Sequence, residues 1–208
     1  MQVKPRVLIF SLAREPFIGG AEVAVKEITA RLPYFEFVTI SANVRNFWSK
    51  YLYPWWASRR ARILHQDKKF ALVWAIMANQ AGMAAARFKS CYFEVPFLLT
   101  LQEGDNLNRW SYRLRLWGPR LFGVFKKADY IQAISHYLAR WARQVGAKCP
   151  ITVVPNGVDL DKFEIRSTKI ETNTKTIITT SRLVEKNGVG DIIEALKFLP
   201  ENVKLLIV

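Results

Sequence analysis

The sequence has too few cysteines and histidines to suggest a disulfide framework or a metal centre. Its 208 residues include two cysteines, Cys91 and Cys149, which are far apart and form no CxxC pair, and two histidines, His65 and His136. Sparse, unpaired cysteines are typical of proteins from reducing compartments. We therefore expect no metal site, no cofactor and, by default, a cytoplasmic location.

Long hydrophobic runs are absent as well. No uninterrupted apolar stretch reaches the ~18 residues that a membrane-spanning helix needs. The best candidate, Phe70–Ala86, is interrupted by Asn79 and Gly82. The N-terminal apolar run, Val3–Phe10, carries basic residues and is followed by no small-residue cleavage site, so a signal peptide is not indicated.

Acidic residues are missing from two long stretches, 37–66 and 106–128. The chain has 31 Lys and Arg against 17 Asp and Glu, a net charge of +14, and both acid-free stretches are rich in Arg, Trp and Tyr. Basic residues mixed with Trp and Tyr are typical of surfaces that rest on anionic lipid headgroups. Aromatic side chains also stack on bases, so composition leaves nucleic acid open as a partner.

Short β-branched runs alternate with helical patterns along most of the chain. Strands are predicted at Val7–Phe10, Phe35–Ser41, Phe70–Ile76, Pro96–Leu101, Tyr130–Ile134 and Ile151–Val154, and helices at Glu22–Leu32, Gln80–Phe88, Leu107–Val124 and His136–Val145. Ser135 is expected to cap the last helix at its start and Gly146 at its end. This alternation predicts the α/β class, with a Rossmann-like parallel sheet covered by helices on both faces. The segment Val44–Arg62 shows no clear pattern and is expected to be a loop.

A polar stretch, Glu164–Lys175, separates this pattern from a second one. A strand is predicted at Thr176–Thr180, a helix at Gly190–Leu199 and a strand at Val203–Val208. We therefore expect a first domain over residues 1–163, a linker over 164–175 and the start of a second Rossmann-like domain over 176–208. Because a lone βαβ unit cannot cover its own core, the chain is expected to stop inside that second domain.

Two glycines, Gly19 and Gly20, follow the first predicted strand and open the first helix. Glycine lets the backbone pass close to a ligand, and a helix N-terminus offers N–H groups to an anion. In open α/β sheets, ligands bind at this carboxyl end of the strands. A plain strand-to-helix turn explains the pair equally well, and the pattern is not the GxGxxG fingerprint of dinucleotide binding.

Polar and acidic residues follow the strand Pro96–Leu101. Gln102, Glu103 and Asp105 lie where catalytic groups usually sit on such sheets. The alternative is a turn in which Asp105 caps the next helix.

A basic loop follows the first strand of the second domain. Arg182 and Lys186 flank the start of a helix, where they are well placed to hold a diphosphate. The alternative is a solvated loop in which Lys186 pairs with Glu185. Another motif, Asn156-Gly157, is on physical grounds simply a turn.

Together these segments resemble retaining family-4 glycosyltransferases over nearly the whole chain. The resemblance rests on IGGAE, TLQEGD, ADYIQAIS, VPNGVDLDKF and SRLVEKNGVGDIIEAL, in that order. It implies a GT-B fold, in which two Rossmann-like domains face each other across a cleft, with the acceptor mainly on the first. It also implies transfer of a sugar from a UDP-, GDP- or ADP-sugar with retention at the anomeric carbon and without a metal.

The resemblance also implies roles for single residues. Gly19 and Gly20 would lie against donor phosphates or acceptor, Arg182 and Lys186 would neutralise the leaving diphosphate, and Glu103 would contact substrate. Two positions depart from the common pattern. Many members have His where this chain has Gln102, which cannot take a proton, and many have Lys where it has Asn187.

The expected function is therefore sugar transfer to a membrane-associated acceptor, lipid-linked or polysaccharide, at the inner face of the cell membrane. One alternative is a non-catalytic fragment that needs a longer chain or a partner for activity. Another is a basic nucleic-acid-binding module, which rests on charge alone because no recognised nucleic-acid motif accompanies it.

Overall fold

A computed structural model describes residues 4–12, 19–41, 47–103, 123–160, 175–181 and 183–208. The chain divides into two compact units, Met1–Val158 and Asp159–Val208. The expected linker, Glu164–Lys175, lies outside the described residues except for its last residue, which begins a strand.

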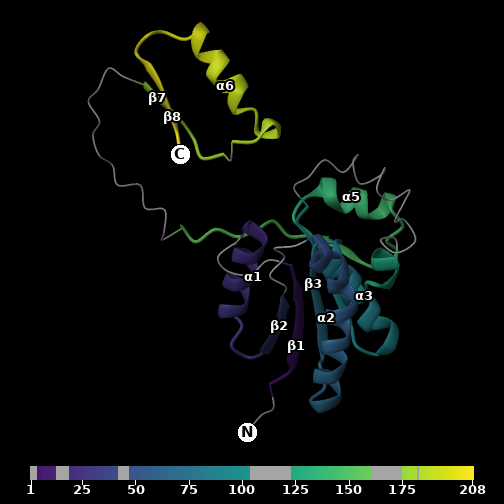
Figure 1. The fold of residues 1–208 in the computed structure, drawn as a ribbon. Coiled ribbons are helices and arrows are strands. Elements are labelled where there is room, and N and C mark those ends of the chain that lie inside the picture. The colour runs from purple at the N-terminus through teal and green to yellow at the C-terminus, as the bar shows by residue number, and fades with distance from the viewer. Residues whose placement is uncertain (1–3, 13–18, 42–46, 104–122, 161–174, 182) are drawn as a thin grey trace. The chain divides into compact units, whose positions relative to one another are not determined.

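The first unit is built on a six-stranded parallel sheet (Figure 1). Its strands are β1 (Arg6–Ser11), β2 (Glu36–Ser41), β3 (Leu72–Ile76), β4 (Phe97–Leu101), β5 (Tyr130–Ala133) and β6 (Ile151–Val153). They lie in the order β2-β1-β3-β4-β5-β6, and every pair of neighbours is parallel. All six strands were predicted from their apolar runs, with ends that differ by one or two residues.

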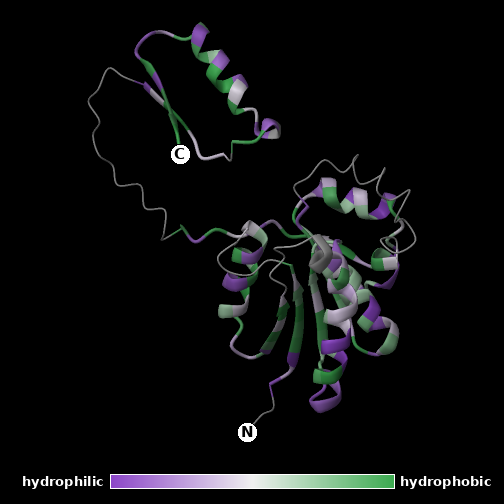
Figure 2. Ribbon diagram, viewed as in Figure 1, coloured by the Kyte–Doolittle hydropathy of each residue, from purple (hydrophilic) through white to green (hydrophobic). Residues whose placement is uncertain are grey.

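Helices cover both faces of this sheet. They are α1 (Gly20–Ala30), α2 (Phe47–Asp67), α3 (Gln80–Cys91) and α5 (His136–Gln144), with a further helical turn at residues 123–127. Because strand side chains alternate, Leu8 and Phe10 join the core with α2, α3 and α5, while Val7 and Ile9 pack with Ala21 of α1. Figure 2 shows the hydrophobic residues concentrated in the strands. The predicted Rossmann-like α/β fold is thus confirmed.

The prediction of a loop at Val44–Arg62 was wrong, because residues 47–67 form α2. Pro54 stands inside this helix, and its apolar residues lie on two faces, which hides the helical period in the sequence. Tyr53, Ala57 and Ala61 are buried, while Trp55 and Trp56 are exposed. The helix is fastened to β2 by the Tyr53 hydroxyl, which donates to the carbonyl oxygen of Ile40 at 2.6 Å.

One of the two histidines is a core residue. His65, near the end of α2, is buried, and its Nδ1 accepts the backbone N–H of Phe70 at 3.0 Å. Its ring lies edge-on to Phe88, with 5.3 Å between the ring centroids. Burial, assisted by the charge of Lys69, lowers the pKa of His65, so the neutral imidazole is the packed form.

The last helix of the first unit confirms the predicted N-cap, Ser135, but its C-cap is one residue earlier than predicted. The Ser135 hydroxyl oxygen accepts the N–H of Leu138 at 3.3 Å, as expected of an N-cap. At the other end the cap residue is Val145, and Gly146 follows it with φ +98°, a conformation that glycine adopts without strain. The predicted helix Leu107–Val124 lies outside the described residues up to 122.

The second unit is a βαβ unit, as predicted. β7 (Lys175–Thr179) and β8 (Val203–Ile207) are parallel and are joined by η2 (Glu185–Asn187), α6 (Val189–Ala195) and η3 (Leu196–Phe198). Val189 of α6 is buried, whereas Ile178 and Leu206 on the strands are exposed.

Candidate active site

Three turns meet at the carboxyl edge of the six-stranded sheet. The strands are all parallel, so the residues that follow β3, β4 and β6 emerge on the same edge. Side-chain hydrogen bonds connect these three turns directly, as described below.

The turn after β3 holds a residue in an unfavourable backbone conformation. Met77 has φ +69°, the one non-glycine residue with positive φ among those described. Such a conformation costs roughly 1–2 kcal/mol for a residue with a Cβ, and strain of this kind gathers at functional sites. It is held by the Met77 N–H, which donates to the Thr100 carbonyl oxygen at 2.8 Å, and by Asn79, which caps α3.

Glu103 sits against this turn. One carboxylate oxygen, Oε1, accepts the N–H of Ala78 at 2.6 Å. The other, Oε2, is shielded from solvent and has no hydrogen-bond partner among the described residues, although the residue as a whole is half-buried. Burial raises the pKa of Glu103 to about 7, because the backbone N–H groups around it offset only part of the desolvation. Near neutral pH this carboxyl can therefore either donate or accept a proton.

Gln102 links the turn after β4 to the turn after β6. Its Nε2 donates to Oδ1 of Asn156 at 3.1 Å. Sequence analysis treated Asn156-Gly157 as a turn only and missed this contact. The only signal in the sequence was that both residues follow strands of one parallel sheet, Gln102 directly after β4 and Asn156 three residues after the end of β6, with β5 between the two strands.

A chain of polar side chains crosses the sheet just behind this edge. The Trp74 indole N–H donates to the Thr100 hydroxyl at 2.8 Å, and that hydroxyl is 2.8 Å from Oε1 of Gln132. Gln132 in turn donates through Nε2 to the Val154 carbonyl oxygen at 3.0 Å. This series of hydrogen bonds runs from β3 to Val154, the residue after β6. It fixes the relative positions of the strand ends from which Gln102 and Glu103 emerge.

The N-terminus of α1 also follows a strand of this sheet, but its first donor is already occupied. The N–H of Gly19 donates to Oε2 of Glu22 at 2.9 Å. A Cβ at Gly19 would lie 2.8 Å from the same oxygen, whereas Gly20 has nothing within 4 Å. A phosphate at this helix end would therefore compete with the Glu22 carboxylate for the Gly19 N–H.

The structure describes the remaining candidate residues only in part. Asp105 and Arg182 lie outside the described residues. Lys186 belongs to η2, between Val184 and a left-handed Gly188 at φ +64°, and its side chain lies outside the described part of the chain. Gln102 and Glu103 are thus the predicted site residues that the structure places side by side on one edge.

Comparison with known proteins identifies the family to which the chain belongs. The model of Glycosyltransferase Family 4 matches residues 28–162, which run from α1 through β6 and include the Gln102–Glu103 edge. No curated protein matches the chain. The fold and the matched family define a glycosyltransferase. More narrowly, the chain belongs to glycosyltransferase family 4.

Within the described residues, no helix combines the length and the apolar character required to cross a membrane.

Proposed function

We propose that the first unit is the acceptor-side domain of a GT-B glycosyltransferase and that the second unit belongs to its donor-side domain. The observation that carries the proposal is the family match, which falls on a parallel sheet whose carboxyl edge carries Gln102 and the Glu103 carboxyl. Edges of this kind are where α/β folds bind substrates.

The donor is a UDP-, GDP- or ADP-sugar, and the sugar is transferred with retention. Arg182 and Lys186 hold the leaving diphosphate, which develops negative charge as the glycosidic bond to it breaks. In this proposal the two cations, rather than a metal ion, balance that charge. Gly20, which has open space around it, allows the donor phosphates to approach the start of α1.

The acceptor binds at the carboxyl edge. Gln102 and Glu103 present hydrogen-bonding groups for sugar hydroxyls, and Asp105 adds a second carboxylate. Gln102 positions a hydroxyl and does not exchange protons, whereas Glu103, with a pKa of about 7, is the group that can take up a hydroxyl proton near neutral pH.

The acceptor is membrane-associated, as a lipid-linked sugar or polysaccharide precursor, and the protein is a peripheral protein at the cytoplasmic face of an anionic membrane. The support is the net charge of +14 and the acid-free, Trp-rich stretch at residues 37–66.

Calorimetric titration of this chain with UDP, GDP and ADP tests the donor assignment. We expect one of the three to bind with 1:1 stoichiometry. Arg182→Ala should weaken that binding at least about tenfold, because a charge-assisted hydrogen bond contributes roughly 1.5–3 kcal/mol. Lys204→Ala, which removes an exposed cation of β8, is the control and should leave the dissociation constant within about twofold.

Absence of binding by all three nucleotides, or equal losses in the two variants, would contradict the assignment of the diphosphate to Arg182 and Lys186.

A further inference from the structure

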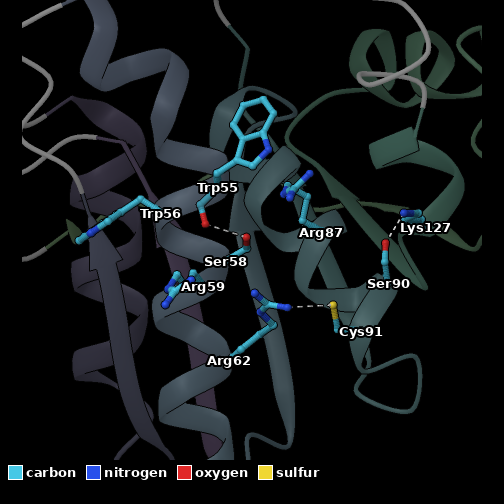
Figure 3. Close-up of a pocket in the computed structure, with 9 residues that line it drawn as sticks. All are labelled: Trp55, Trp56, Ser58, Arg59, Arg62, Arg87, Ser90, Cys91 and Lys127. Carbon is cyan, nitrogen blue, oxygen red and sulfur yellow. Dashed lines mark hydrogen bonds between the residues drawn. The ribbon is translucent and has the colours of Figure 1, made fainter.

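A pocket lies between α2, α3 and the helical turn at 123–127, on the outer side of these helices (Figure 3). Its volume is about 530 Å³, and it is lined by Trp55, Trp56, Ser58, Arg59, Arg62, Arg87, Ser90, Cys91 and Lys127. α3 begins at the carboxyl edge of the sheet and contributes to the pocket from its last turns. The pocket is therefore separate from the candidate active site.

The pocket carries four positive charges that no acid among the described residues balances. No acidic residue lines it, and among the described residues none of Arg59, Arg62, Arg87 and Lys127 forms an ion pair. The contacts of two of these cations are with neutral groups. Arg62 Nη1 lies 3.8 Å from the Cys91 sulfur, and Lys127 donates to the Ser90 hydroxyl. Converging cations without a carboxylate partner are the arrangement that binds phosphate oxygens.

Apolar and aromatic side chains flank these cations on α2. Leu52, Trp55, Trp56 and Ile63 are exposed by 62, 42, 49 and 59% respectively. Their spacing of three, four and seven residues places them on one stripe of the helix, together with Arg59. The Arg87 guanidinium lies 4.9 Å from the centroid of the Trp55 ring, so the aromatic and cationic parts of the surface are continuous.

We propose that this pocket binds the phosphate group of an anionic phospholipid headgroup. The four cations hold the phosphate, the two indoles lie at the level of the headgroups, and Leu52 and Ile63 meet the acyl boundary. A free phosphorylated solute would use the cations but would gain nothing from the exposed apolar stripe, which favours the lipid. The inference rests on the membrane part of the proposed function and is independent of the sugar-transfer chemistry.

Vesicle binding by two charge-matched variants tests the pocket. Arg59→Gln with Lys127→Gln removes two lining cations, while Lys126→Gln with Lys148→Gln removes two exposed cations that do not line it. Binding to vesicles of phosphatidylglycerol and phosphatidylcholine is measured by sedimentation, with pure phosphatidylcholine as reference. We expect the pocket pair to bind the anionic vesicles at least about tenfold more weakly than the control pair.

Alkylation of Cys91 supplies a readout at the pocket itself. Both cysteines are free thiols, so the half-buried Cys149 serves as an internal reference. Anionic vesicles should slow the alkylation of Cys91 relative to Cys149, whereas inorganic phosphate and glycerol 3-phosphate at millimolar concentration should leave the ratio unchanged.

Equal loss of vesicle binding in the two variants would overturn the assignment of the pocket as a lipid-binding site, since net charge alone would then explain the attraction to the vesicles. Protection of Cys91 by soluble phosphate without vesicle binding would overturn the lipid assignment. Nucleotide binding is measured without vesicles, so a failure of this inference is distinguishable from a failure of the donor assignment.

Discussion

At the scale of single residues, Glu103 is a carboxyl whose pKa depends strongly on its surroundings. Its Oε1 accepts the N–H that follows the strained Met77, while its Oε2 is buried and has no hydrogen-bond partner in the part of the chain that the structure describes. Folding therefore favours the neutral acid over the carboxylate. This preference makes the stability of the fold depend on pH near neutrality.

Glu103→Gln should remove that dependence. The wild-type carboxyl has a pKa of about 7 when folded and 4.5 ordinarily. Its contribution to stability is therefore complete below about pH 4.5 and is lost as pH rises through about 7, a loss of the order of 3 kcal/mol. Glutamine keeps an oxygen for the Ala78 N–H and cannot ionise. Urea unfolding between pH 5 and 8 should give a flatter profile for the variant, with higher stability than wild type at pH 8.

Asp67→Asn removes an exposed carboxyl and is the control for this experiment, with a pH profile expected to parallel wild type. Parallel profiles for wild type and Glu103→Gln would instead show that Glu103 does not titrate between its folded and unfolded states as described.

At the scale of elements, α3 approaches the sheet closely at Gly82. A Cβ there would lie 2.9 Å from Cγ1 of Val124 and 3.0 Å from the Met77 carbonyl oxygen. The second of these is a backbone atom at the strained turn, so it has little freedom to move. Because Gly82 has no side chain, α3 can pack directly against the Met77 turn of the candidate active site. A larger residue at this position would therefore displace either the helix or the turn.

Gly82→Ala should destabilise the protein by about 1–3 kcal/mol, the usual range for overpacking. This loss outweighs the gain of up to ~1 kcal/mol in helix propensity. Gly20→Ala, with nothing within 4 Å, is the matched control and should be neutral or mildly stabilising. The midpoint of urea unfolding measures both. A Gly82→Ala protein as stable as wild type would show that the helix can shift away from the sheet at no cost.

The elements also show what the sequence could predict. β-branched runs such as the one in β3 identify buried parallel strands, and their ends were placed within two residues. α2 was missed because it is apolar both toward the sheet and toward the outside. At the candidate site, the sequence predicted the position of Glu103 after β4. It could not predict the hydrogen-bond partner of Glu103, because that partner is the backbone N–H of Ala78 and leaves no mark in the pattern of side chains. The contact between Gln102 and Asn156 likewise depends on the order of strands in the sheet.

At the scale of the whole molecule, the two units differ in how completely they bury their apolar residues. The first encloses an extensive core on one face of its sheet and a smaller one on the other. The second has two strands and exposes Ile178, Leu206 and Phe198. A two-stranded sheet with one helix is marginal in water.

A chain comprising residues 1–158 should therefore fold cooperatively by itself, with a melting temperature within a few degrees of the full chain. A peptide comprising residues 159–208 should show little ordered structure. Circular dichroism during thermal unfolding measures both. A first unit that fails to fold alone would show that the second unit contributes to its stability.

The strand order of the sheet has a consequence for synthesis on the ribosome. β1 and β2 leave the ribosome first and are neighbours in the sheet, and β3, β4, β5 and β6 then lie in the sheet in the order in which they are made. Each later strand therefore takes its place at one open edge, next to a strand that has already been made, and no strand has to be inserted between two others. Two strands alone are marginal in water and the domain folds as a unit, but this topology requires no rearrangement of the strands that have already left the ribosome.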